Sequence, residues 1–293
     1  MKFRIFLLVM LVGALMGGCT AASSATPSVV PTHVLTVTPT LVPLTLTPSP
    51  TPTFTPTLSI PLTVTATLDP IRHIPPTLML HRRSLTFDSV KFLKDFIVLL
   101  KQNNMHVVTY EDIRKDPGIT QREQGKLFII SIDDLYLRYP IEGSVMEMIA
   151  LLREAGYPAV LGVVTESNTL FPATISTYRE LIALGWEIAS HTDTHRNLGI
   201  MEKTAPRYVY TEVQTSVEKI TNAVGVRPYT LILPEGQMVD DPRFIKRAEI
   251  FWIVGINGGV IYDSRKTMVY VGREGPDGTA DQTFKIMMGR FNP

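Results

Sequence analysis

The chain of 293 residues contains a single cysteine, Cys19, so no disulfide can form within it. Charge is absent from a long N-terminal stretch, because no Asp, Glu, Lys or Arg occurs between Arg4 and Asp69. The net charge is only +1, which leaves no basic surface for nucleic acid and no Lys/Arg run suited to anionic lipid. Nucleic-acid binding is therefore not expected.

The first residues have the layout of a secretory signal peptide. Residues 1–19 carry Lys2 and Arg4, then an apolar run over residues 5–16, then small residues before Cys19. The apolar run is too short to span a bilayer comfortably. The four residues that end at the cysteine resemble the bacterial lipoprotein cleavage box, in which the cysteine is lipidated and becomes the mature N-terminus. We expect an exported, extracellular lipoprotein anchored to the outer face of a bacterial membrane; an ordinary secretory signal and a secreted protein are the alternative.

Threonine and proline dominate the segment from residue 20 to residue 70. Its frequent prolines remove amide donors and favour extended polyproline conformations, and no periodicity allows it to bury a face. The segment 20–70 is therefore predicted to be a disordered linker. One medium-sized folded domain remains, over residues 71–293.

From about Pro75 onward, apolar runs alternate with amphipathic segments. This alternation is typical of β/α units and a largely parallel sheet. Three glycines are placed to end helices: Gly156, Gly185 and Gly225. The expected strands span residues 77–80, 126–132, 158–164, 186–190, 229–233, 251–254 and 267–271, and the expected helices span 89–103, 145–152, 175–184 and 209–224.

Two polar motifs follow strand-like runs and together form a hypothetical metal site. Asp133 and Asp134 follow the second expected strand, and His191 and His195 follow the fourth. In β/α folds the functional groups gather at the carboxyl ends of strands, so these side chains are expected to meet. One carboxylate and two imidazoles can hold a zinc-like ion and leave a position open for water, as a catalytic site requires. The second carboxylate would then be free to act as a base.

These motifs resemble those of the polysaccharide deacetylase family, the NodB-homology domain of carbohydrate esterase family 4. The stretch from Ser131 to Asp134 is similar to the family's Thr-Phe-Asp-Asp motif, and residues 191–195 are similar to its His-Ser/Thr-x-x-His motif. Residues 234–236, Pro-Glu-Gly, resemble its Pro-Tyr-Gly motif. The resemblance covers about residues 75–293. It implies an α/β fold, a distorted and incomplete (β/α) barrel with a parallel strand core.

A further motif resembles one branch of that family. Residues 78–81, which end in His81, resemble the Leu-x-Tyr-His segment of the circularly permuted poly-N-acetylglucosamine deacetylases, in which the catalytic histidine lies at the front of the domain. The C-terminal residues 287–291 contain no histidine. The permuted branch is therefore the better match.

The resemblance implies a division of roles among these side chains. Asp133 would take a proton from the attacking water, and His81 would protonate the departing sugar amine. The backbone N–H of Glu235 would help to hold the oxyanion. One divalent metal ion, zinc with cobalt or nickel as alternatives, would polarise the acetamide and activate the water. Its ligands would be Asp134, His191 and His195.

The expected function is that of a metal-dependent hydrolase that removes N-acetyl groups from an N-acetylglucosamine polysaccharide of the cell envelope or matrix. No protein partner is inferred. A surface-tethered carbohydrate-binding protein with a degenerate deacetylase fold is one alternative, and a metal hydrolase of another amide or ester is a second. The first alternative is motivated by three departures from the family pattern. Leu135 replaces a glycine, Glu235 an aromatic residue and Leu80 a tyrosine.

The sequence leaves the roles of several other side chains open. Asp193 either orients one of the two imidazoles or occupies a solvated turn. Tyr136 and Trp252 either contact sugar or belong to the core. The carboxylate that would pair with the proposed acid is one of three: Asp240, Asp241 and Asp263.

Overall fold

A computed structural model describes residues 74–256, 260–262 and 269–291 of the chain. The predicted signal peptide and linker, the proposed lipidation of Cys19 and the candidate Asp263 concern residues outside these ranges. Within the described ranges, no helix has both the length and the apolar character needed to cross a bilayer.

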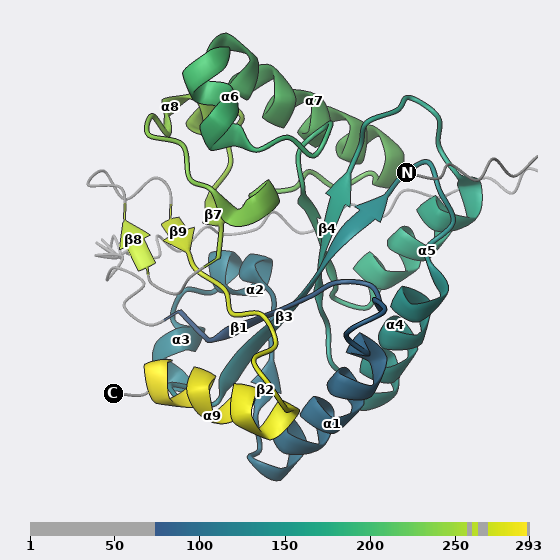
Figure 1. Ribbon diagram of the computed structural model, residues 1–293, viewed down its shortest axis with the longest axis vertical. Coiled ribbons are helices and arrows are strands. Elements are labelled where there is room, and N and C mark those ends of the chain that lie inside the picture. The colour runs from purple at the N-terminus through teal and green to yellow at the C-terminus, as the bar shows by residue number, and fades with distance from the viewer. Residues whose placement is uncertain (1–73, 257–259, 263–268, 292–293) are drawn as a thin grey trace, which may run out of the picture. The chain divides into compact units, whose positions relative to one another are not determined.

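A curved and largely parallel sheet forms the centre of the domain (Figure 1). Its strands are β1 (Thr77–Leu80), β2 (His106–Val107), β3 (Leu127–Tyr136), β4 (Val160–Val164), β5 (Glu187–Ser190), β6 (Thr230–Ile232), β7 (Trp252–Val254), β8 (Val260–Tyr262) and β9 (Val269–Val271). They are ordered β1-β3-β4-β5-β6-β7-β9-β8, and β2 pairs with β3. Among the described strands only β8 is antiparallel to its neighbour, β9.

Helices lie around the curved sheet and mostly cover its outside (Figure 1), although Tyr110 and Ile113 of one short helix pack in the apolar cluster inside the curve. They are α1 (Ser89–Gln102), α2 (Tyr110–Lys115), α3 (Ile119–Arg122), α4 (Gly143–Ala155), α5 (Pro172–Ala183), α6 (Leu198–Thr204), α7 (Arg207–Val224), α8 (Arg243–Lys246) and α9 (Ala280–Phe291), with a 3₁₀ turn, η1, at Pro234–Gly236. The predicted helix ends are confirmed at α4 and α7, where Gly156 and Gly225 adopt left-handed conformations with φ of 72° and 85°.

The two margins of the sheet approach each other through the segment that follows β9. The Met79 N–H donates to the Glu274 carbonyl at 2.8 Å, and the Glu274 N–H donates to the Thr77 carbonyl at 3.0 Å. These bonds form a single parallel bridge between β1 and that segment. Within the described ranges the curled sheet is closed at this one point, which confirms the predicted distorted, incomplete (β/α) barrel with a parallel strand core.

Both faces of the central strands are buried. Along β3, Ile129 belongs to the apolar cluster inside the curve and Ile130 to the cluster beneath the helices, as the alternation of side chains in a strand requires. Trp252 is fully buried in the inner cluster, with its ring centroid 5.5 Å from that of Tyr110. The sequence left Trp252 either in contact with sugar or in the core, and in the structure it lies in the core.

Each of the seven expected strands and four expected helices overlaps an observed element, although residues 267–268 of the last expected strand lie outside the described ranges. One difference is informative. The second strand was expected to end at Ile132, but β3 continues through the acidic pair to Tyr136. Its register with β4 shifts between Ile132 and Leu135. A bulge of this kind bends a strand and redirects one side chain, so the acidic pair lies on an irregular strand and not beyond its end.

A carboxyl group is buried at the amino end of β5. Glu187 is 7% exposed; one of its oxygens accepts from the Glu111 N–H at 2.9 Å, and the other accepts from the Thr230 hydroxyl. Burial raises the pKa of Glu187 from 4.5 to about 7. The folded state therefore holds this proton more tightly than the unfolded state. The resulting stabilisation is complete below the unfolded pKa and is lost as the pH rises through about 7.

We expect Glu187→Gln to remove this pH dependence, because the amide stays neutral at every pH. The loss of stability attributable to this group amounts to about 3 kcal/mol between its unfolded and folded pKa values. Urea unfolding from pH 4 to 8 gives the free energy of unfolding of the wild type and of the variant, and the change in their difference with pH measures this loss. Glu154→Gln, an exposed change, serves as the control. Parallel profiles for wild type and Glu187→Gln would contradict the prediction.

Candidate metal centre

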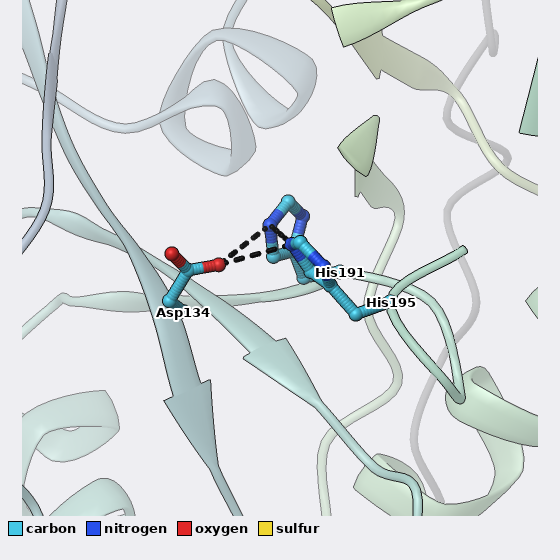
Figure 2. Close-up of side chains that lie close together, drawn as sticks. All are labelled: Asp134, His191 and His195. Carbon is cyan, nitrogen blue, oxygen red and sulfur yellow. Dashed lines mark hydrogen bonds and ion pairs between the residues drawn. The ribbon is translucent and has the colours of Figure 1, made fainter. Parts of the chain in front are cut away.

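Three side chains converge at the carboxyl end of the sheet (Figure 2). Asp134 projects from β3, and His191 and His195 lie in the loop after β5. Asp134 Oδ1 lies 3.0 Å from His195 Nε2 and 3.4 Å from His191 Nε2. The two Nε2 atoms are 3.1 Å apart. The predicted meeting of these three residues is therefore present in the structure.

The geometry of this triad fits a metal ion. Tetrahedral ligands about 2.0–2.2 Å from zinc lie roughly 3.4 Å from one another, close to the separations found here. Asp134 Oδ1 is buried and accepts no hydrogen bond of regular geometry, although two imidazole nitrogens face it. A buried carboxylate oxygen without a donor is costly unless a cation satisfies it. Asp134, His191 and His195 thus form a group that can hold a metal ion.

The orientation of His191 is fixed from behind. Its Nδ1 lies 2.9 Å from the Ile232 carbonyl on β6. Because a carbonyl only accepts, Nδ1 carries the proton, and the lone pair of Nε2 points toward the triad. The β6 backbone therefore selects the ring tautomer that a metal ligand needs.

The electrostatics of the triad favour an ionised carboxylate. Burial opposes the charge of Asp134, but the adjacent imidazoles of His191 and His195 outweigh burial and lower the pKa of the carboxyl. The Asp134 carboxylate, 3.0 Å away, raises the pKa of His195. Metal binding at this site would therefore compete with a proton.

Backbone strain is concentrated at the site. Of the six non-glycine residues with positive φ in the described part of the chain, four lie here: Asp134 (62°), Thr192 (65°), His195 (57°) and Glu235 (56°). Such conformations are uncommon for residues with a Cβ and are frequent at functional sites. Leu135 is not among them. The unusual φ lies one residue earlier, at Asp134.

Asp133 lies beneath the triad and is held by a buried arginine. Asp133 is 2% exposed and Arg273, which follows β9, is 1% exposed. Arg273 Nη1 lies 2.8 Å from both carboxylate oxygens, and it also donates to Ser131 Oγ at 2.8 Å. The Arg273 Nε–H donates to the Gly255 carbonyl at 3.1 Å. Burial acts to raise the pKa of Asp133, but the Arg273 charge outweighs it and keeps the pKa low.

Sequence reasoning missed Arg273. The rule that selected the other motifs, a polar residue just after an apolar strand, also applies to the Val-Tyr-Val-Gly-Arg stretch that ends at Arg273.

The packing around Asp133 depends on a small neighbour as well. A Cβ on Gly162 of β4 would lie 3.2 Å from Asp133 Oδ1, tighter than most real contacts.

His81 lies at the open side of the site. Its Nε2 is 3.9 Å from Asp134 Oδ2, and its side chain is 44% exposed. Within the described ranges neither Asp240 nor Asp241 forms an ion pair with it, and Asp241 instead pairs with Arg243 at 2.6 Å. Asp134, which the sequence did not suggest as a partner, instead lies within ion-pair distance of His81.

The loop that carries the two histidines is anchored to α7. Asp193 Oδ1 accepts from Lys219 Nζ at 2.8 Å and from Thr165 Oγ1 at 2.7 Å. The Thr194 hydroxyl donates to Glu212 at 2.8 Å. Asp193 therefore neither orients an imidazole nor lies free in solvent; it ties the loop to the helix.

Two cavities adjoin the triad. The first, about 450 Å³, is lined by Asp134, Leu135 and Tyr136 among others. The second, about 300 Å³, is lined by His195 and Glu235. Because Asp134 and His195 are in contact, the triad lies where the two cavities approach each other.

The three residues that depart from the family pattern lie at different places in the structure. Glu235 Oε2 accepts from Asn197 Nδ2 at 2.8 Å, and Glu235 is not part of the group of possible metal ligands. Leu80 is fully buried in the core beneath the helices. Leu135 is buried and forms part of the first cavity wall. None of the three displaces a member of the triad.

Residues 120–249 match the polysaccharide deacetylase family. The matched region includes the triad, Asp133 and Glu235 and excludes His81 and Arg273. No curated protein sequence matches the chain.

Solved structures share the fold. A Streptococcus pyogenes deacetylase, PplD, in complex with acetate has a TM-score of 0.58 at 16% identity, over 75% of this chain and 100% of that chain. For IcaB from Ammonifex degensii the TM-score is 0.57 at 15% identity, over 73% and 96% of the two chains. For a de-N-acetylase from Aggregatibacter actinomycetemcomitans it is 0.55 at 19% identity, over 72% and 98%.

Proposed function

We propose that this chain, whose residues 120–249 match the polysaccharide deacetylase family, is a metal-dependent N-deacetylase of an N-acetylglucosamine polysaccharide. The observation that carries the proposal is the convergence of Asp134, His191 and His195, with one imidazole already oriented by Ile232. A group of three protein ligands is typical of catalytic rather than structural zinc sites. Zinc is the metal that we propose, with cobalt or nickel as alternatives.

The reaction converts an acetamide and water into acetate and a free amine. A metal ion bound at the triad would polarise the acetamide carbonyl and make water a better nucleophile. Asp133, ionised beside Arg273, would accept the proton from the attacking water. His81, close to Asp134 and exposed to substrate, would protonate the departing nitrogen. The backbone N–H of Glu235 would donate to the oxyanion.

The test is acetate release from a panel of N-acetylglucosamine oligomers, peptidoglycan and acetylated xylan, with metal content measured on the same sample. We expect about one zinc per chain, acetate from the N-acetylated glycans, and loss of both metal and activity in His195→Ala. Val98→Ala, an exposed change on α1, is the control for effects of purification and storage. A protein that binds metal and glycan but releases no acetate would instead be the degenerate carbohydrate-binding protein.

Two finer assignments remain part of the proposal. Placement of His81 directly after β1, at the front of the domain, supports the circularly permuted poly-N-acetylglucosamine deacetylase branch. Lipidation at Cys19 would anchor the protein to the outer face of a bacterial membrane. Recovery of Cys19→Ala in the membrane fraction at wild-type levels would disprove the lipid anchor.

A further inference from the structure

The two imidazoles of the metal triad are held to different degrees. His191 is 2% exposed, and its Nδ1–H donates to the Ile232 carbonyl at 2.9 Å. The His195 side chain is 36% exposed, and among the described residues its ring forms hydrogen bonds or ion pairs only within the triad. A ligating histidine is usually held by a group bound to its second ring nitrogen. Because His195 lacks such a group in the described part of the chain, its position depends on its backbone.

The backbone of this loop has an unfavourable conformation. Thr192 and His195 have φ values of 65° and 57°. Residues with a Cβ keep such values only where the surrounding structure imposes them. A loop free to leave this conformation would carry His195 away from the triad, and metal binding would then have to restore the order at a cost in affinity.

Helix α7 supplies the contacts that hold the loop. Glu212 and Lys219 are about two turns apart and so lie on the same face of α7. The Glu212 carbonyl accepts from the Asp193 N–H at 3.2 Å, and the Glu212 carboxylate accepts from the Thr194 hydroxyl at 2.8 Å. Asp193 and Thr194 lie between the two histidines in the sequence. The helix therefore holds the loop at the residues just before His195.

Lys219 joins the loop to a neighbouring strand. Its Nζ lies 2.8 Å from Asp193 Oδ1 and donates to the Thr165 carbonyl, just after β4, at 3.1 Å. The Thr165 hydroxyl completes the contact by donating to Asp193 Oδ1 at 2.7 Å. The Lys219 and Asp193 side chains are 22% and 16% exposed, so salt and water screen this ion pair less than an exposed one. Because Asp193 hydrogen-bonds to neither imidazole in the described chain, the contact acts on His195 through the backbone.

We propose that Lys219 is a positioning residue of the metal centre. By fixing the loop it gives His195 the support that the Ile232 carbonyl gives His191, and it thereby strengthens metal binding. Lys219 is not a member of the triad and lines neither adjoining cavity, so it acts without touching metal or substrate. This inference rests on the metal site of the proposed function and adds a residue that sets how tightly the metal is held.

The test measures the zinc affinity of the full chain by competition with a chelator. Lys219→Met removes the charge and should bind zinc about 10- to 100-fold more weakly, the usual effect of removing a group that supports a ligand. Lys219→Arg, which keeps the charge, should recover part of the loss. The visible spectrum of the cobalt-substituted protein should also change in Lys219→Met, because it depends on the geometry of the ligands.

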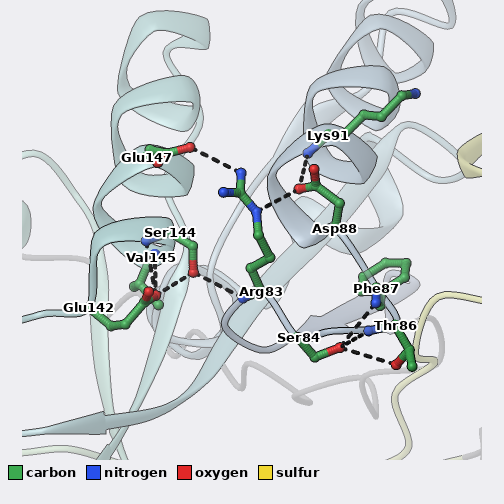
Figure 3. Close-up of polar contacts among 10 residues, drawn as sticks. All are labelled: Arg83, Ser84, Thr86, Phe87, Asp88, Lys91, Glu142, Ser144, Val145 and Glu147. Atoms are coloured by element: carbon green, nitrogen blue, oxygen red, sulfur yellow. Dashed lines mark hydrogen bonds and ion pairs between the residues drawn. The ribbon is translucent and has the colours of Figure 1, made fainter.

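Arg83→Gln is the matched control. Arg83 also fastens a loop at the carboxyl end of the sheet to a helix, since it pairs with Asp88 at 3.0 Å and with Glu147 of α4 at 3.3 Å (Figure 3). That loop carries His81 but no member of the triad. We expect zinc affinity within about twofold of the wild type and an unchanged cobalt spectrum.

Urea unfolding of the metal-free proteins separates positioning from stability. A lower stability of Lys219→Met with unchanged zinc affinity and cobalt spectrum would overturn the inference, and so would an equal loss of affinity in Arg83→Gln. If Lys219→Met does not fold, the double variant Asp193→Asn/Lys219→Met, which leaves no unpaired charge, takes its place in the same comparison. Neither readout needs substrate, so a chain that releases no acetate disproves the proposed function without affecting this test. A wild type that binds neither zinc nor cobalt would overturn both.

Discussion

Acetate release by Asp133→Asn should be about 10²- to 10⁴-fold slower than by the wild type, the usual contribution of a positioned general base. The amide has nearly the same shape as the carboxylate and can still accept a hydrogen bond from Arg273. It cannot accept a proton from water. Because Asp133 is not one of the three possible metal ligands, metal content should remain near one ion per chain. Single-turnover acetate release together with metal analysis of the same sample measures both quantities.

A matched control is available at the opposite end of β5. Glu187→Gln makes the same chemical change to another buried carboxyl group, but at the amino end of the strand, whereas His191 follows its carboxyl end. We expect acetate release by Glu187→Gln to remain within about twofold of the wild type, because no substrate or triad contact is lost. Retention of more than a tenth of wild-type activity by Asp133→Asn would exclude Asp133 as the base.

Much of the fold and most of the site could be predicted because both depend on local patterns. Strands with both faces buried appear as continuous apolar runs, and the glycines after α4 and α7 mark where those helices end. The carboxyl ends of parallel strands share one edge, so Asp134, His191 and His195 could be placed together without knowledge of the strand order.

The features that escaped prediction depend on tertiary contacts. Short helices such as α6 and α8 have too few turns to show a periodic apolar stripe. The bulge in β3, which redirects Asp134, arises from register with β4 and leaves no trace in composition. The link between Asp133 and Arg273 joins residues 140 positions apart, and one sequence contains no information about such pairs.

The side chain of Glu235 is held away from the metal ligands by a neighbouring residue. A carboxylate at this position, where the family has an aromatic residue, could compete for the metal or repel the oxyanion. In the structure its Oε2 atom accepts from Asn197, a residue that also caps α6 through Oδ1. Because Asn197 is itself fixed by this cap, it holds the Glu235 carboxylate at the second cavity. The backbone of Glu235 has a left-handed φ of 56°.

Removal of the buried arginine should have the largest effect on stability. Arg273→Met leaves the Asp133 carboxylate buried without its ion-pair partner, and we expect the free energy of unfolding to fall by about 3–5 kcal/mol at neutral pH. In the wild type the arginine keeps the pKa of Asp133 low, so the pair stabilises the fold above the unfolded pKa and this contribution is lost on acidification. The cost of Arg273→Met should therefore shrink as the pH falls and Asp133 becomes protonated.

A double-mutant cycle separates this charge effect from a loss of packing. Asp133→Asn in the Arg273→Met background removes the unpaired charge, so the double variant should be more stable than the sum of the two single changes predicts. The excess should be about 1–3 kcal/mol by urea unfolding at pH 7. Additive losses would mean that Arg273 acts mainly through its bonds to Ser131 Oγ and the Gly255 carbonyl, which Asp133→Asn alone leaves intact. A positive coupling energy would instead identify the ion pair as the contact that keeps Asp133 ionised in a nearly dry site, the state in which it can accept a proton.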